Sequence, residues 1–543
     1  MPKPSAEPEH PDEKAQPKGS GFHQPVALAA AGLVLGVAFE VLFFKRPLGV
    51  SFAVWVGLCL VALFFLGRRE GVSPAPVAWA LAGVVLLLSI LPVFRAEPLT
   101  VFLDVVLALA GLALLVRVYQ QGDLLSFGFF DFGLGLVLPP VEAWFRPWSV
   151  LSETQAQVFQ GRQTQSALAG VGRGLLLAFP IVVAFLVLLS SADLIFGDYV
   201  RQTLAWLDLA RFFDYLGRLT VILLIGVFSL GALVVALRRS DGYRLIGEDK
   251  PLLPPFLGFT EAAVVLGAVD LLFGLFVVVQ LRYFFGGEAN ITAAGYTYAE
   301  YARRGFAELV FLALLTLGMI LALGAWTRRE RRSHVQSFNG LSGLLVLLTG
   351  VILTSAFMRL LLYEEAYGFS RLRTYTHVAI LWMGVLFLAF LGLLLAGRLR
   401  AFAVACAVGA IGFCLTLNLL NVDAFIVRQN FANPSRAGEL DAGYLATLSA
   451  DAVPALVSRL DQLPPDARDD LLPGMACGLQ ALRDRQQRVG WPSYRWVQAE
   501  ALTRLESVSG DLASYPLEEI EGTTAFTVTV GEESEYCGRF GLQ

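Results

Sequence analysis

The stretch of the sequence richest in groups that can do chemistry is Gly295–Glu308, which reads GYTYAEYARRGFAE. Glu300, Arg304 and Glu308 follow one another at intervals of four residues, so a helix places them in one charged stripe. Arg303 lies beside this stripe, and three tyrosines occupy the same stretch. Such a run can bind an anionic group, or it can anchor a helix at a membrane surface.

The two interpretations differ in what the arginines bind. In the first, four arginines form a cationic floor for an anionic head group or substrate: Arg282, Arg303, Arg304 and Arg359. In the second they pair with carboxylates inside the protein, and Glu40, Asp104 and Glu308 are available. The second is favoured, because arginines buried in a membrane protein usually have an internal partner.

Polar side chains inside the apolar segments gather near one depth. If the segments alternate in direction across a membrane, the following residues all fall toward the face that carries the C-terminus, and we call them the polar layer: Glu40, Asp104, Glu308, Arg359, His377, Asn418, Asn421 and Asp423. Asp270 is an exception, since it lies near the middle of its segment. It is a candidate for proton or ion coupling, and a structural hydrogen bond between helices is the alternative that is slightly favoured.

Metal, nucleotide and hydrolytic chemistry find no support in the sequence. The four histidines are far apart, no His, Cys or carboxylate cluster has ligand spacing, and we expect neither a metal nor a cofactor. No phosphate-binding glycine loop, nucleophile elbow or dinucleotide fingerprint is present. The net charge of -4 gives no reason to expect a nucleic-acid partner.

The elements that position these groups are long apolar segments. The chain has 543 residues, 56% hydrophobic and 16% charged, with a mean hydropathy of +0.64. We therefore predict an all-α polytopic integral membrane protein, in contact with the lipid bilayer, with a small helical C-terminal extramembrane domain. About eleven transmembrane helices are expected: 25–44, 48–67, 75–94, 99–119, 172–191, 219–237, 259–281, 306–326, 341–362, 375–397 and 399–421.

The ends of the segments predict orientation. Four of five Arg/Lys clusters fall inside the cell when the N-terminus is cytoplasmic, and an odd number of spans then places the C-terminus outside. Residues 1–24 are expected to be a disordered cytoplasmic tail, residues 25–421 the transmembrane domain and residues 422–543 the C-terminal domain. The run 124–138 is short for a span and fits an interfacial or re-entrant segment better.

The region after residue 421 differs in composition from the rest. Leucine at helical spacing predicts three or four helices, and the alternation in 523–530 predicts one strand. Cys477 and Cys537 form a disulfide if this domain is extracytoplasmic; two free thiols are the alternative. Residues 430–543 are the part of the chain expected to bind another envelope protein.

Four motifs carry a resemblance to a known family: YFFGG at 283–287, TYAEYARRGF at 297–306, LNVDAFIVRQN at 420–430 and LDAGYLATLSADAVPAL at 440–456. Residues 175–460 thereby resemble a family of bacterial polytopic membrane proteins catalogued as domain of unknown function four-one-seven-three. The resemblance implies a bacterial integral membrane protein and supplies no activity and no catalytic residue.

Three functions remain open on the sequence. A non-enzymatic scaffold or sensor of the cell envelope ranks slightly above a transporter or channel for a small or anionic solute that uses the polar layer and Asp270. An enzyme acting on a lipid-linked substrate ranks last, because the first outer loop, 45–48, is short and basic. The expected location is the bacterial plasma membrane.

Overall fold

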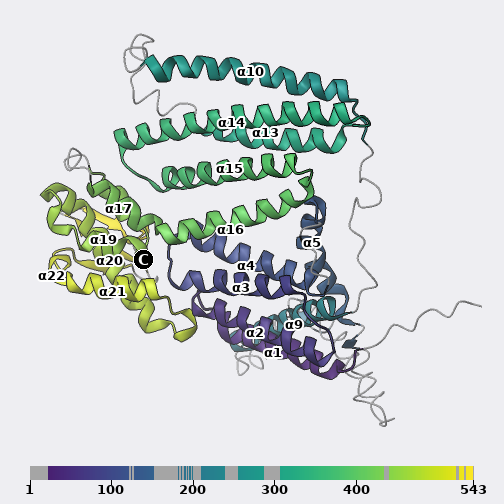
Figure 1. Cartoon of the computed structure of the whole chain (residues 1–543). Coiled ribbons are helices and arrows are strands. Elements are labelled where there is room, and N and C mark those ends of the chain that lie inside the picture. The colour runs from purple at the N-terminus through teal and green to yellow at the C-terminus, as the bar shows by residue number, and fades with distance from the viewer. Residues whose placement is uncertain are drawn as a thin grey trace, which may run out of the picture.

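A computed structural model describes residues 22–120, 127–148, 209–238, 255–286, 306–432, 440–520, 525–530 and 533–541, with isolated positions between them. Long helices run side by side, and the C-terminal region packs against one end of them (Figure 1). Within these ranges, ten helices are long and apolar enough to cross a membrane. The prediction of an all-α polytopic membrane protein is confirmed. The span expected at 172–191 lies outside the described ranges.

The first group of helices packs around one apolar core. It comprises α1 (Pro25–Phe43), α2 (Val50–Arg69), α3 (Pro76–Ile90) with η1 (Leu91–Val93), α4 (Pro98–Val118) and α9 (Leu209–Leu237). α1 and α9 run antiparallel and approach closely at glycines. A Cβ on Gly36 would lie 2.3 Å from the carbonyl oxygen of Ile222. Small residues at such crossings let backbones approach, as is usual between helices in lipid.

The second group contains α10 (Phe259–Gly286), α13 (Phe306–Trp326), α14 (Arg332–Tyr367) and α15 (Arg371–Leu395), which share a separate core. α16 (Phe402–Leu420) follows the short turn η3 (Leu399–Ala401) and lies between the two groups (Figure 1). The outward faces carry exposed leucines, such as Leu271 and Leu388. These faces are apolar because they meet lipid rather than water.

α5 (Phe129–Phe145) occupies the run that was expected to be interfacial or re-entrant. It lies across the ends of the long helices remote from the C-terminal region (Figure 1). Its Phe129 ring contacts Phe402, at the start of α16, and its Ala143 backbone touches Gly231 of α9. Pro139 and Pro140 lie inside the helix.

The chain from Val422 onward is called the C-terminal domain below. It begins with α17 (Val422–Ala432), and its two other helices longer than ten residues in the described ranges are α20 (Pro465–Arg488) and α21 (Trp496–Ser507). Short helical segments complete it: α18 (Ala442–Ala446), η5 (Ala450–Ala452), α19 (Val453–Val457), η6 (Leu460–Gln462), η7 (Trp491–Ser493), α22 (Ser509–Leu512) and η8 (Cys537–Arg539).

A small antiparallel sheet packs onto α20. Its order is β1 (Leu517–Glu519), β2 (Phe526–Val530) and β3 (Glu533–Tyr536), with Leu517 opposite Val528 and Val528 opposite Glu535. The expectation of a single strand was therefore incomplete, because the acidic β1 and β3 lack the apolar alternation that reveals β2. A disulfide joins Cys477 of α20 to Cys537 after β3.

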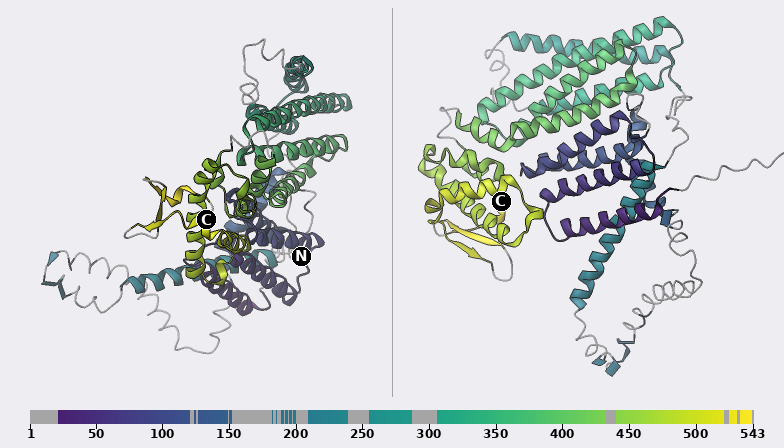
Figure 2. Two further views of the ribbon diagram at one scale, coloured as in Figure 1. Left: turned by 90° about the vertical axis from the view of Figure 1, so that its left-hand side faces the viewer. Right: turned by 60° about the horizontal axis from the view of Figure 1, so that its bottom comes forward.

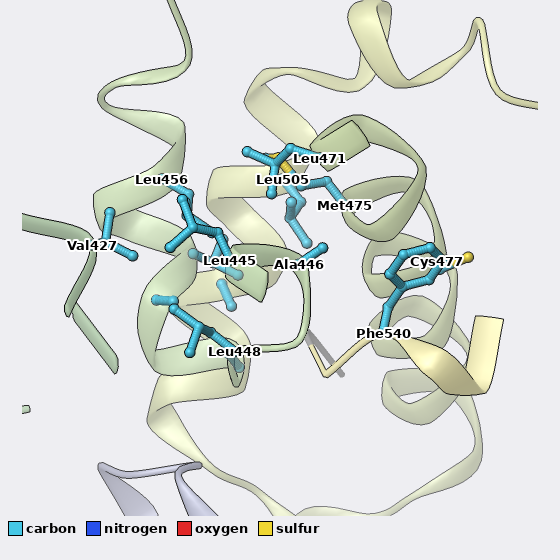
Figure 3. Packing of buried hydrophobic residues seen from close by; sticks show 14 of the residues in the cluster. Val427, Leu445, Ala446, Leu448, Leu456, Leu471, Met475, Cys477, Leu505 and Phe540 are labelled. Atoms are coloured by element: carbon cyan, nitrogen blue, oxygen red, sulfur yellow. The ribbon is translucent and has the colours of Figure 1, made fainter. Parts of the chain in front are cut away.

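The apolar core of the C-terminal domain continues into the membrane helices. Leu445, Leu456, Met475 and Leu505 are fully buried among one another (Figure 3), and the same cluster includes Leu417 of α16. The domain lies near α1, α2, α15 and α16 and away from α10 and α13 in both views of Figure 2. It is therefore packed on one part of the bundle rather than tethered to it.

Candidate functional site: the junction of the membrane helices and the C-terminal domain

The most elaborate polar arrangement in the described residues lies where the C-terminal domain meets the membrane helices. Arg371, at the start of α15, donates from Nε and Nη2 to the two carboxylate oxygens of Asp423 at 2.8 and 2.6 Å. Asp423 is fully buried in the first turn of α17 and also accepts a bond from the backbone N–H of Ser449 at 2.7 Å. This two-point geometry is the strongest form of an arginine–carboxylate pair.

A second buried carboxylate fixes the start of α4. The backbone N–H groups of Ala96 and Glu97 donate to Oδ2 of Asp451 at 2.6 and 2.8 Å. Glu97 in turn caps α4, since its side chain accepts from the N–H groups of Leu99 and Thr100. Tyr375 of α15 donates its hydroxyl to Glu97. A carboxylate at a helix N-terminus satisfies amide groups that have no partner within the helix.

These contacts together form a closed ring. Tyr375 and Arg371 lie one turn apart on α15, and Ser449 Oγ approaches Asp451 Oδ2 at 3.4 Å. We call the resulting set the junction ring: Glu97, Arg371, Tyr375, Asp423, Ser449 and Asp451. It ties α4, α15 and α17 to the turn before α19, so that each of its carboxylates is held by at least two donors.

A branch of the ring extends toward the membrane interior. Arg95 donates from Nε and Nη2 to the carbonyl oxygen of Asn418 at 2.8 and 2.6 Å, and its Nη1 lies 4.0 Å from Asp451. The amide of Asn418 donates to Asp104 at 2.9 Å, and the Cys414 thiol donates to the same oxygen at 3.0 Å. Asp104 is fully buried. The buried polar groups of α4 and α16 thus bond to each other.

The electrostatics of the ring are set by burial. Burial raises the pKa of Asp451 from 3.8 to about 6, while the two backbone N–H groups and Arg95 act in the opposite direction. Burial also raises the pKa of the Tyr444 phenol, whose oxygen accepts the backbone N–H of Arg371 at 2.9 Å. Both groups therefore favour their neutral forms more than they would in water.

Other members of the predicted polar layer form separate pairs. Glu40 accepts from Arg218 of α9 at 3.2 Å, and His377 Nδ1 lies 3.0 Å from Glu364. Asn421 adopts a left-handed conformation (φ 51°) that separates α16 from α17. Glu308 is exposed in the first turn of α13.

The cationic floor is not assembled among the described side chains. Glu300, Arg303, Arg304 and the Arg282 side chain lie outside the described part of the chain, and Arg359 bonds to Gln280 at 3.0 Å. The carboxylates of the polar layer were expected to pair with those arginines, and for two of these carboxylates the expectation was wrong. Glu40 binds Arg218, and Asp104 binds Asn418, because α9 and α16 are the helices packed beside them.

Sequence reasoning overlooked Glu97, Arg371, Tyr375, Ser449 and Asp451. Two local signals were present. Glu97 precedes Pro98, an arrangement typical of a helix start, and Ser449 and Asp451 stand just before Val453–Pro454. Arg371 offered no such signal, because an arginine at a helix start is common at a membrane surface.

Asp270 has a different environment. It lies on α10 and is 7% exposed, and neither carboxylate oxygen has a hydrogen-bond partner among the described residues. It is also absent from the linings of three cavities, which lie between η7 and α20, between α5 and its neighbours, and beside Tyr367. In the described ranges, no group of three or more His, Cys, Asp or Glu side chains is arranged to hold a metal ion.

Comparison with known proteins places the chain in a family. The model of a domain of unknown function, DUF4153, matches residues 82–458, and the chain belongs to that family. The family number expected from the motifs, four-one-seven-three, was wrong, and the match starts well before residue 175. No curated protein and no solved structure matches the chain. The junction ring lies within the matched residues, whereas both disulfide cysteines lie beyond them.

Proposed function

We propose that this protein is a non-enzymatic membrane scaffold or sensor of the bacterial cell envelope, in which the C-terminal domain binds another envelope protein. The closed junction ring carries this proposal. Its acids are bonded to groups of the same chain, so they position the domain and are not presented to a substrate. Separating such a buried pair would leave an uncompensated charge in the interior, which is unfavourable. The pair therefore favours one position of the domain.

The proposed orientation puts the N-terminus in the cytoplasm of a bacterial cell and the C-terminal domain outside its plasma membrane. α2 starts beside the domain, where the N–H of Val50 donates to Tyr494, so Arg68 and Arg69 at its other end lie on the opposite face. α15 likewise starts at the domain and ends before Arg398. Arginine-rich ends are typical of the cytoplasmic face, and a disulfide is typical of the other.

The directions of the helices support an odd number of spans. α9 runs parallel to α4, because the Gln120 amide, just after α4, donates to the carbonyl oxygens of Ala236 and Arg238 at the end of α9. Two parallel neighbours need an odd number of crossings between them. Since α5 lies across the helix ends, one span at the expected position 172–191 fits this requirement.

Site-specific photo-crosslinking in cells tests the proposal. A crosslinker at Asp461 or Tyr536, both exposed on the C-terminal domain, is expected to capture a defined protein, whereas one at Leu271 on the lipid-facing side of α10 is not. In a separate pull-down, deleting residues 430–543 should abolish association with the captured protein, together with the cellular phenotype. If every partner and phenotype survives that deletion, the scaffold proposal fails.

A second candidate function is transport of a small or anionic solute. It rests on Asp270, whose buried carboxylate oxygens have no partner among the described residues. A carboxylate in such a place is suited to carrying a proton or binding a cation in passage. Solute or proton flux into proteoliposomes should be lost in Asp270→Asn and in Arg304→Ala, with expression retained. Unchanged flux in both variants rules this candidate out.

A further inference from the structure

A small cavity in the C-terminal domain is lined by two arginines. It has a volume of about 140 Å³ and lies between the end of α20, η7 and the start of α21. Arg485 and Arg495 line it together with Gln498, Ser493 and Tyr494. We call it the arginine pocket. It is separate from the junction ring, although Asp451 of the ring acts electrostatically on Arg495.

The two arginines have buried donors without acceptors. The Nε atoms of Arg485 and Arg495 are both inaccessible to solvent and donate no hydrogen bond within the described residues. By contrast, several arginines on the surface of the same domain form ion pairs: Arg468 with Asp511, Arg483 with Glu506, and Arg488 with Asp484. Arg485 and Arg495 line the same cavity, and neither forms an ion pair among the described residues, so the two guanidinium groups indicate a site for an anion from outside the chain.

The charges around the cavity favour an anion. Burial lowers the pKa of both guanidinium groups, and the positive charge of Arg485 lowers the pKa of Arg495 further. Asp484, the acid next to Arg485 in sequence, is already bonded to Gln480 and Arg488. A bound anion would relieve the repulsion between the two arginines. Guanidinium groups suit phosphate oxygens in particular, because their N–H groups match them two at a time.

Two residues that line the pocket contact the loop between α1 and α2. Ser493 Oγ donates to the carbonyl oxygen of Pro47 at 2.7 Å, and the N–H of Val50 donates to the carbonyl oxygen of Tyr494 at 3.0 Å. Both contacts reach the loop between α1 and α2. Around them, Trp491, Tyr494 and Trp496 are 63%, 45% and 54% exposed. Exposed Trp and Tyr beside a helix end are typical of the level of the lipid head groups.

We propose that the arginine pocket binds a phosphate group, held by the guanidinium groups of Arg485 and Arg495. The phosphate belongs either to the head group of an anionic phospholipid or to free phosphate. The exposed side chains of Trp491 and Tyr494, which line the pocket, favour the lipid. This site does not depend on the scaffold function proposed above, since it stands on the two arginines and their place beside the α1–α2 loop.

Thermal unfolding of the full-length protein in neutral detergent micelles tests the site. Two probes are added separately: phosphatidic acid mixed into the micelles, and inorganic phosphate at constant ionic strength with chloride as the reference salt. We expect the unfolding midpoint to rise with phosphatidic acid, and the apparent affinity to fall by about tenfold or more in Arg485→Gln/Arg495→Gln. Arg483→Gln, on the same helix but at the surface, should bind like the unaltered protein.

The outcomes separate the two sources of phosphate. Stabilisation by phosphatidic acid alone identifies a lipid head group, and stabilisation by inorganic phosphate alone identifies free phosphate. If both stabilise and compete, the pocket recognises the phosphate itself. The proposal is overturned if neither probe acts beyond chloride, or if the double variant binds as tightly as the unaltered protein. Arg495→Lys supplies a milder variant, and competition on the unaltered protein needs no variant at all.

Discussion

Two parts of this molecule bury carboxylates in opposite ways. At the junction, Asp423 and Asp451 are held by arginine, by backbone N–H groups and by a hydroxyl, and the apolar core around them runs from α16 into the C-terminal domain. On α10, Asp270 is buried without a partner among the described residues, and the domain does not cover that helix. The first arrangement fastens elements together, whereas the second leaves a buried carboxylate with no hydrogen bond inside the described part of the chain.

The largest effect should follow from breaking the junction. Asp423→Ala leaves Arg371 without its carboxylate and the N–H of Ser449 without an acceptor, so the free energy of unfolding should fall by about 3–5 kcal/mol. Denaturant titration in micelles measures this loss, and limited proteolysis reports release of the domain. Asp461→Ala, at a side chain that is 99% exposed, is the control and should change little. Equal stability of the two variants would contradict the fastening role.

The disulfide shares no residue with the junction ring and allows the domain's own stability to be measured separately. Cys477→Ser/Cys537→Ser opens a link between residues 60 apart, which should lower the free energy of unfolding by about 2–4 kcal/mol. Protease sites within the C-terminal domain should become accessible while α4 and α15 stay associated. A variant whose membrane helices separate as readily as in Asp423→Ala would show that the two features are not independent.

We expect the free energy of unfolding to depend on pH through Asp451. Its pKa of about 6 in the folded protein exceeds the ordinary 3.8, so the folded state keeps the proton to higher pH than the unfolded chain does. This contribution to stability is complete below about pH 4 and is lost as the pH rises to about 6, a decrease of about 1–3 kcal/mol. Unfolding measured across this range should show the slope, and Asp451→Asn should flatten it. A slope of the same size in that variant would exclude Asp451 as its source.

The smallest effect is expected at Asp270, and a matched substitution at Asp104 gives the reference. Asp104→Asn disturbs an oxygen that accepts bonds from Asn418 and Cys414, and should cost about 1–3 kcal/mol. Asp270→Asn breaks no bond among the described residues and should change the free energy of unfolding by less than about 1 kcal/mol. A larger loss at Asp270 than at Asp104 would reverse the comparison and show that Asp270 is structural.

The sequence predicted the positions of the helices better than it predicted which side chains pair. Apolar runs revealed the spans, but α14 begins at Arg332 rather than 341 and α9 at Leu209 rather than 219, because polar residues continue a helix beyond the apolar run. Asp423 and His377 were correctly noticed as polar residues near spans, whereas Arg371 and Glu364 were not named as their partners. Such pairs are decided by which helices pack together, and a single sequence does not show that.

The bond between Asp104 and the Cys414–Asn418 segment also has a consequence for biosynthesis. Asp104 and Cys414 are 310 residues apart, so at ribosomal speed roughly 15–60 s separate their appearance. During that interval α4 has been made while its buried acid still lacks both donors. The Asp104 carboxylate of a newly inserted α4 therefore lacks these two hydrogen bonds until α16 is inserted beside it. Truncated chains that end before residue 414 should be poorly retained in the membrane and quickly degraded.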